Sequence, residues 1–128
     1  MQYLLRPGWV FVLDDDEVAR KHAEACLRRQ GWRVHLFADA NSFVEAMLVQ
    51  PPEAALVDIF LPQGAGTTIV SRLRRNSRTS RMRVVAYTAT SHDDRELLMH
   101  SGFDEVLSKP GLPQDFERLL PAPEAVPD

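Results

Sequence analysis

The sequence has one cysteine, Cys26, and a single cysteine cannot form a disulfide within the chain. Apolar residues recur around it at helical spacing, which predicts a buried thiol. No window approaches the roughly 18 to 20 apolar residues that a membrane-spanning helix requires. The N-terminus also lacks the basic start, apolar stretch and cleavage site of a secretory signal. These absences lead us to expect a cytoplasmic protein without a membrane partner.

Lysine is scarce as well, because Lys21 and Lys109 are the two lysines among 15 basic residues. Arginines instead crowd one stretch of the chain: Arg72, Arg74, Arg75, Arg78, Arg81 and Arg83. No aromatic residues are interleaved with them for stacking on bases, and the formal net charge of the chain is −3. We therefore expect no direct binding of nucleic acid and interpret this arginine stretch as a solvated surface. Whether it meets an acidic partner stays open.

The composition is that of one ordinary soluble domain. With 128 residues, 45% of them hydrophobic and 26% charged, the chain suffices for one hydrophobic core but not for two. Residues 121–128 are proline-rich, so we expect a domain over residues 1–120 followed by a tail or linker. The four histidines show no spacing typical of metal ligands, and we expect them to be exposed or hydrogen-bonded.

Short apolar runs alternate with helical patterns along the chain. The predicted strands are Trp9–Leu13, Arg33–Phe37, Ala54–Asp58, Val84–Tyr87 and Glu105–Leu107. Each is followed by apolar residues at helical spacing, and a loop rich in breakers spans Pro62 to Gly66. The strict alternation of strands and helices predicts an α/β fold, namely a doubly wound five-stranded parallel sheet with helices on both faces. Strand order 2-1-3-4-5, the flavodoxin-like order, is one of the few windings that right-handed crossovers allow.

Polar residues follow four of the five predicted strands. Asp14 and Asp15 follow the first, Asp58 ends the third, Thr88 follows the fourth and Lys109 follows the fifth. In an open parallel sheet, functional groups gather at the carboxyl ends of the strands, near the point where strand order reverses. With the first and third strands adjacent, the three acids would converge.

Three carboxylates in one place repel each other and require a cation. Mg²⁺ fits best, because it prefers hard oxygen ligands and is commonly held by one or two carboxylates with phosphate oxygens. Lys109 adds a compact ammonium, and Thr88 adds a hydroxyl that can donate to a phosphoryl oxygen. Asp58 stands alone opposite the acidic pair, so we expect it to attack phosphorus and form an acyl phosphate, with Asp14 and Asp15 on the metal.

With these residues in place, the sequence resembles the response-regulator receiver domains of two-component phosphorelays. Four pieces carry the resemblance over nearly the whole chain: Val12–Glu17, Leu56–Pro62 with Gly66, Tyr87–Ala89, and Ser108–Pro110. The resemblance implies the doubly wound fold, Mg²⁺ dependence and phosphoryl transfer from a partner histidine kinase or phosphotransfer protein. It implies a phosphoacceptor signalling domain rather than an enzyme.

The resemblance also implies a role for each site residue. Asp15, Asp58 and the backbone carbonyl of Phe60 would ligate the metal, and Asp14 would act through water. Thr88 and Lys109 would contact the phosphoryl group. The bond from Lys109 to the following proline is typically cis in such proteins.

Several positions depart from the family's pattern. Val106 stands where many receivers carry an aromatic switch residue, and Gly111 stands where an aromatic usually follows Lys-Pro. Tyr87 or Phe103 could take over the switch, although each is more often simply packed in a core. The two variable positions that flank the attacking water are Phe60 and Thr90. Neither offers a carboxylate or carboxamide, so we expect slow autodephosphorylation.

Two other functions stay open. Asp14 to Val18 also matches the Asp-x-Asp-x-[Thr/Val] motif of haloacid-dehalogenase-type phosphatases, in which Asp14 would be the nucleophile. No acidic pair follows Lys109, and Asp58 would have no role there. The other alternative is a receiver-like module that binds partners regardless of phosphorylation, supported by Val106 and Gly111. The cognate kinase, the output and formation of a homodimer are not determined by the sequence.

Overall fold

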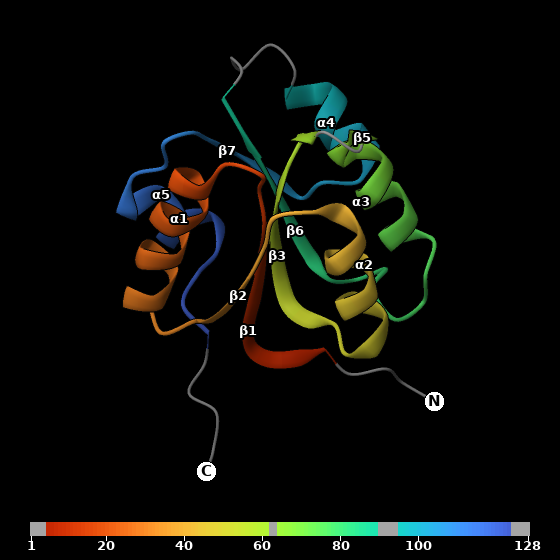
Figure 1. Cartoon of the computed structure of the whole chain (residues 1–128), viewed down its shortest axis with the longest axis horizontal. Coiled ribbons are helices and arrows are strands. Elements are labelled where there is room, and N and C mark those ends of the chain that lie inside the picture. The colour runs from red at the N-terminus through yellow and green to blue at the C-terminus, as the bar shows by residue number, and fades with distance from the viewer. Residues whose placement is uncertain (1–4, 62–63, 90–94, 124–128) are drawn as a thin grey trace.

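A computed structural model describes residues 5–61, 64–89 and 95–123. It contains a five-stranded sheet in the order β2-β1-β3-β6-β7, and all neighbouring strands in it are parallel (Figure 1). The strands are β1 (Arg6–Leu13), β2 (Arg33–Phe37), β3 (Pro52–Asp58), β6 (Arg83–Thr88) and β7 (Glu105–Ser108). Numbered within this sheet, the order is 2-1-3-4-5, so the predicted topology is confirmed.

Helices cover both faces of the sheet. They are α1 (Glu17–Arg29), α2 (Ala40–Val49), α3 (Gly66–Arg74), α4 (Arg95–Ser101) and α5 (Pro113–Leu119). Helices α1 and α5 lie on one face, and α2, α3 and α4 lie on the other (Figure 1). Across the described ranges, the structure has no helix with the length and apolar character that a membrane span requires.

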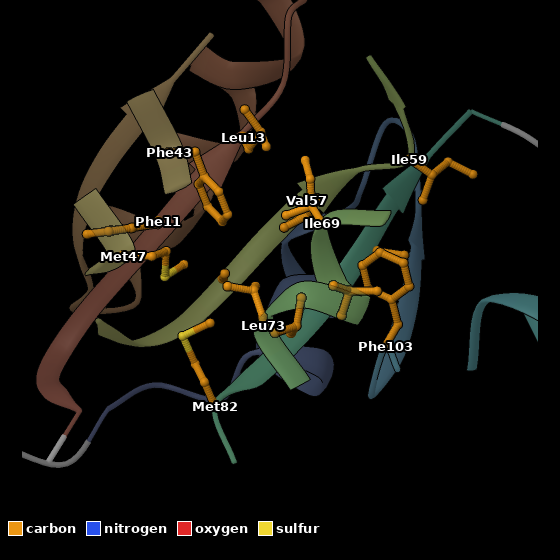
Figure 2. Close-up of a cluster of buried hydrophobic side chains, with 14 of the residues drawn as sticks. Phe11, Leu13, Phe43, Met47, Val57, Ile59, Ile69, Leu73, Met82 and Phe103 are labelled. Atoms are coloured by element: carbon orange, nitrogen blue, oxygen red, sulfur yellow. The ribbon is translucent and has the colours of Figure 1, made fainter. Parts of the chain in front are cut away.

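Strand β1 shows why the sheet needs both layers. Val10 and Val12 belong to the apolar cluster under α1 and α5, whereas Phe11 and Leu13 belong to the cluster under α2, α3 and α4 (Figure 2). All four side chains are at most 3% exposed. A strand buried on both faces is apolar at every position, which explains the continuous run in the sequence.

Strand β2 has the predicted bounds, whereas other elements differ at their ends. Strand β1 begins at Arg6 rather than Trp9, because the Arg6 N–H donates to the carbonyl of Pro51 at 2.8 Å. A short antiparallel pair joins β4 (Phe60–Leu61), just before the predicted loop, to β5 (Gly64–Ala65), which lies within it. Gly66 opens α3 directly behind it. A Cβ atom at Gly66 would overlap the carbonyl oxygen of Asp58, so the close approach requires glycine.

The arginine stretch divides into two groups. Arg72, Arg75 and Arg81 are exposed, as expected for a solvated surface. The others donate to backbone carbonyls: Arg74 to those of Gly102 and Met82, Arg78 to those of Leu48 and Val49, and Arg83 to that of Leu119. The expectation of a merely solvated surface was therefore wrong for half of these residues, whose guanidinium groups hold neighbouring elements together.

Candidate functional site

Four polar side chains lie at the carboxyl-terminal edge of the sheet. Asp14 follows β1, Asp58 ends β3, Thr88 ends β6 and Lys109 follows β7. Because β1 and β3 are neighbours, carboxylate oxygens of Asp14, Asp15 and Asp58 lie within 4.8 Å of one another. The structure therefore brings the three acids together where the topology places a switch point.

The acids differ in their exposure to solvent. Asp14 is 0% exposed and Asp58 is 4% exposed, whereas Asp15 is exposed. The Lys109 ammonium lies 2.6 Å from Oδ2 of Asp14 and 3.5 Å from Oδ2 of Asp58. Burial of a carboxylate costs free energy unless a cation or hydrogen bond compensates it, and one ammonium faces two buried carboxylates here.

Backbone groups fix the inner oxygens of the buried acids. The N–H of Asp16 donates to Oδ1 of Asp14 at 2.9 Å, and the N–H of Phe60 donates to Oδ1 of Asp58 at 3.0 Å. In both cases the donor lies two residues after the acid, which is the local Asx-turn pattern. The Oδ2 atom of each carboxylate is therefore the one that faces Lys109.

Burial raises the pKa of Asp58 to about 6. The Phe60 N–H and the Lys109 ammonium oppose this rise in pKa, whereas Asp14 and Asp15 add to it. The site thus holds more negative charge than Lys109 alone can neutralise.

One buried oxygen bears on a metal. Oδ2 of Asp14 is buried and pairs with the Lys109 ammonium at 2.6 Å. Carboxylate oxygens of Asp15 and Asp58 lie within 4.8 Å of one of Asp14, so three acids converge on this one cation. Such a donor set fits a hard divalent cation such as Mg²⁺.

Thr88 is 1% exposed, and its carbonyl accepts from the Lys109 N–H at 2.7 Å, so the two predicted phosphoryl contacts are joined through the backbone. Lys109–Pro110 is cis, as the resemblance implied.

Tyr87 and Phe103 are both buried in the core, in clusters on opposite faces of the sheet. Val106 is partly buried against the cluster that contains Phe103. Thr90 lies outside the described residues.

His22 was not singled out from the sequence as a site residue. Its Nε2 lies 2.6 Å from the carbonyl oxygen of Gly111, two residues after Lys109, which makes it a hydrogen-bonded histidine as expected. The signal in the sequence is faint: His22 lies one helical turn before Cys26, on the apolar stripe of α1.

A family model described as the response regulator receiver domain matches residues 10–120. The chain belongs to this family. As a receiver domain of two-component response regulators it takes part in signalling, and the family is one of phosphoacceptor domains rather than of enzymes.

The curated relatives include longer regulators. The chain is 28% identical over 108 residues to the transcriptional regulatory protein GltR of Pseudomonas aeruginosa, covering 84% of this chain and 45% of that protein. It is 28% identical to the phosphate regulon transcriptional regulatory protein PhoB of Escherichia coli, covering 88% of this chain and 50% of that protein. This receiver domain therefore spans about half the length of these two relatives.

Solved structures share the fold. A putative response regulator from Chloroflexus aurantiacus matches with a TM-score of 0.83 at 24% identity, over 88% of this chain and 93% of that one. The receiver domain of the sensor histidine kinase PA1611 of P. aeruginosa matches with a TM-score of 0.80 at 30% identity, over 89% of this chain and 94% of that one. That structure is described with a magnesium ion coordinated in its active site cleft.

Proposed function

We propose that this receiver domain accepts a phosphoryl group on Asp58 in an Mg²⁺-dependent reaction, and that phosphorylation changes its interactions with partners. The donor is the phosphohistidine of a histidine kinase or phosphotransfer protein. The observation that carries the proposal is the site at the carboxyl-terminal edge of the sheet, where two buried carboxylates from adjacent strands share the Lys109 ammonium. The domain is residues 1–120, and residues 121–128 are a tail or linker.

The chemistry is a displacement at phosphorus. An oxygen of Asp58 forms a bond to phosphorus, the phosphorus–nitrogen bond breaks, and its electron pair stays on the donor imidazole. The Phe60 N–H holds Oδ1 of Asp58, which leaves Oδ2 as the attacking oxygen. Lys109 and Thr88 contact the phosphoryl oxygens: the ammonium neutralises charge that develops on them, and the Thr88 hydroxyl donates a hydrogen bond.

Mg²⁺ would be held by Asp15, Asp58 and the Phe60 carbonyl, with Asp14 acting through water. When bound, it supplies positive charge at the phosphoryl oxygens. The convergence of the Asp14, Asp15 and Asp58 carboxylates supports this assignment, since the single ammonium of Lys109 faces two buried acids.

Release of the phosphoryl group by water is expected to be slow. The Phe60 side chain is 62% exposed at the rim of the site and has no group that can orient an attacking water. We expect Phe60→Asn, which adds a carboxamide, to shorten the lifetime of the acyl phosphate about tenfold, measured by loss of label from the isolated protein. A wild-type half-life of only seconds to a minute would contradict this expectation.

The phosphatase alternative predicts a different nucleophile. The second acid of that motif is Asp16, and here its side chain accepts from the Ala19 N–H at 3.0 Å and caps α1. The experiment is to treat the phosphorylated protein with borohydride, which reduces an acyl phosphate to an alcohol, and to map the reduced residue. Reduction at Asp58 supports the proposal, whereas reduction at Asp14 would favour the phosphatase.

A further inference from the structure

The loop that carries Lys109 is attached to the rest of the domain at three points. The Lys109 N–H donates to the carbonyl of Thr88 at 2.7 Å. The Lys109 ammonium lies over the ring of Tyr87. On the opposite side, the carbonyl oxygen of Gly111 lies 2.6 Å from Nε2 of His22 on α1. The first two contacts tie the loop to β6, and the third ties it to a helix.

The direction of the His22 contact follows from its chemistry. A carbonyl oxygen can only accept, so Nε2 carries the proton and donates. The two residues are 89 positions apart in the sequence, and the contact is partly buried. It is therefore a long-range hydrogen bond that a leucine of similar size could not replace.

Packing around Gly111 leaves little room for the loop to move. A Cβ atom there would lie 2.7 Å from a ring carbon of Phe116 and 3.1 Å from Leu107. The Phe116 ring also makes edge contacts with His22 and Tyr87, each at a centroid distance of 6.1 Å. Phe116 and Leu107 thus fill the space that a side chain at position 111 would need, which explains why a glycine occupies this position.

The enclosed glycine is coupled to the ammonium. The Lys109 Nζ lies 5.0 Å from the centroid of the Tyr87 ring, within the range of a cation–π contact. The Tyr87 ring in turn contacts the ring of Phe116, which lies against Gly111. A displacement of the Gly111 carbonyl would therefore move both the backbone next to Lys109 and the ring beneath its ammonium.

We infer that His22 is a positioning residue for phosphoryl transfer: its hydrogen bond to Gly111 ties α1 to the Lys109 loop and sets the ammonium over Asp14 and Asp58. This inference rests on the proposed function, because its effect is on the rate at which Asp58 is phosphorylated. It also gives a physical role to Gly111, where the family usually has an aromatic. His22 itself does not touch the reacting atoms.

The test compares two replacements of His22. His22→Leu removes the donor and keeps apolar contact with Phe116, whereas His22→Gln retains an N–H at similar reach. Acetyl phosphate with Mg²⁺ is the phosphoryl donor, and the maximal rate and KM are measured on protein shown to be folded. We expect His22→Leu to lower the maximal rate about fivefold with little change in KM, and His22→Gln to restore it to within about twofold of wild type. The control is His100→Leu on α4, which we expect to match wild type.

A double-mutant cycle separates positioning from general support of the fold. In a Lys109→Ala background, followed over long incubations, His22→Leu should change the residual rate by less than about 1.5-fold, because the group that it positions is gone. If His22→Leu does not fold, His22→Met takes its place in both experiments.

Several results would overturn the inference. One is a His22→Leu protein that is phosphorylated at the wild-type rate, whether or not its unfolding midpoint is lowered. Another is a His22→Leu substitution that lowers the rate by the same factor in the Lys109→Ala background as in wild type. Failure of His22→Gln to restore the rate would also overturn it. These results leave the proposed function intact. Failure of wild type to take up phosphoryl on Asp58 would instead overturn the proposed function, and the inference with it.

Discussion

The two cationic regions of the described chain differ in what their side chains contact. In the arginine stretch, Arg74 donates to the carbonyls of Gly102 and Met82 and pairs with Asp104 at 2.8 Å. Lys109 instead faces Asp14 and Asp58. Arginine's planar fork suits several fixed acceptors at once, whereas a compact ammonium suits a point contact that a transferred group can share. The density of positive charge in the sequence therefore marks structural support, and the isolated lysine marks the site at which we propose phosphoryl transfer.

The largest effect should come from Lys109. Lys109→Met removes the ammonium that faces both buried carboxylates, and we expect the rate of phosphorylation by acetyl phosphate to fall about 100-fold. The matched control is Lys21→Met, because Lys21 is the other lysine and its side chain is 69% exposed in a helical ion pair with Glu17. Its rate should equal that of wild type. Equal losses in both variants would remove the contrast between Lys109 and an ordinary surface lysine.

Arg74 should show the reverse behaviour. Arg74→Met leaves the carbonyls of Gly102 and Met82 without the guanidinium donor and removes the ion pair with Asp104, so the free energy of unfolding should fall by about 2 kcal/mol. The Asp104 carboxylate keeps its hydrogen bond from the Val84 N–H. Urea unfolding measures this loss. The rate of phosphorylation of the folded protein should change by less than about twofold, since Arg74 does not contact the site. The control is exposed Arg75→Met, with a change within about 0.5 kcal/mol.

The smallest expected effect is the dependence of the free energy of unfolding on pH, which the Asp58 carboxyl group causes. The pKa of Asp58 rises from 3.8 to about 6 on folding because of burial, so the folded state binds this proton more tightly than the unfolded state does. The resulting stability is fully present below the unfolded pKa and is lost as pH rises through about 6. In chelator, wild type should therefore lose on the order of 1 to 2 kcal/mol relative to Asp58→Asn between acid and neutral pH. A difference that does not vary with pH would show that burial does not perturb Asp58.

Much of the fold, and the grouping of polar residues at the carboxyl-terminal edge of the sheet, could be predicted from the sequence. Strict alternation predicted the parallel sheet, and right-handed crossovers left 2-1-3-4-5 as one of a few strand orders. Asp14, Asp58, Thr88 and Lys109 lie at the strand ends that the short apolar runs predicted. Local spacing carries this information because each of these residues directly follows or ends its own strand. The β4–β5 pair was missed because two-residue strands leave no periodic pattern.

Contacts between distant segments could not be predicted in this way. His22 and Gly111 are 89 residues apart, and nothing in either local pattern indicates that α1 approaches the Lys109 loop there. The arginine contacts were missed for the same reason, since their acceptors are carbonyls whose positions depend on tertiary packing. The missing information was the placement of side chains across elements.

The most direct test of the central claim is intact mass after incubation with acetyl phosphate. The account predicts that wild type gains the mass of one phosphoryl group with Mg²⁺ present, gains none in chelator, and that Asp58→Asn gains none in either condition. An Asp58→Asn protein that still takes up one phosphoryl group, or a folded wild type that takes up none with Mg²⁺, would contradict it.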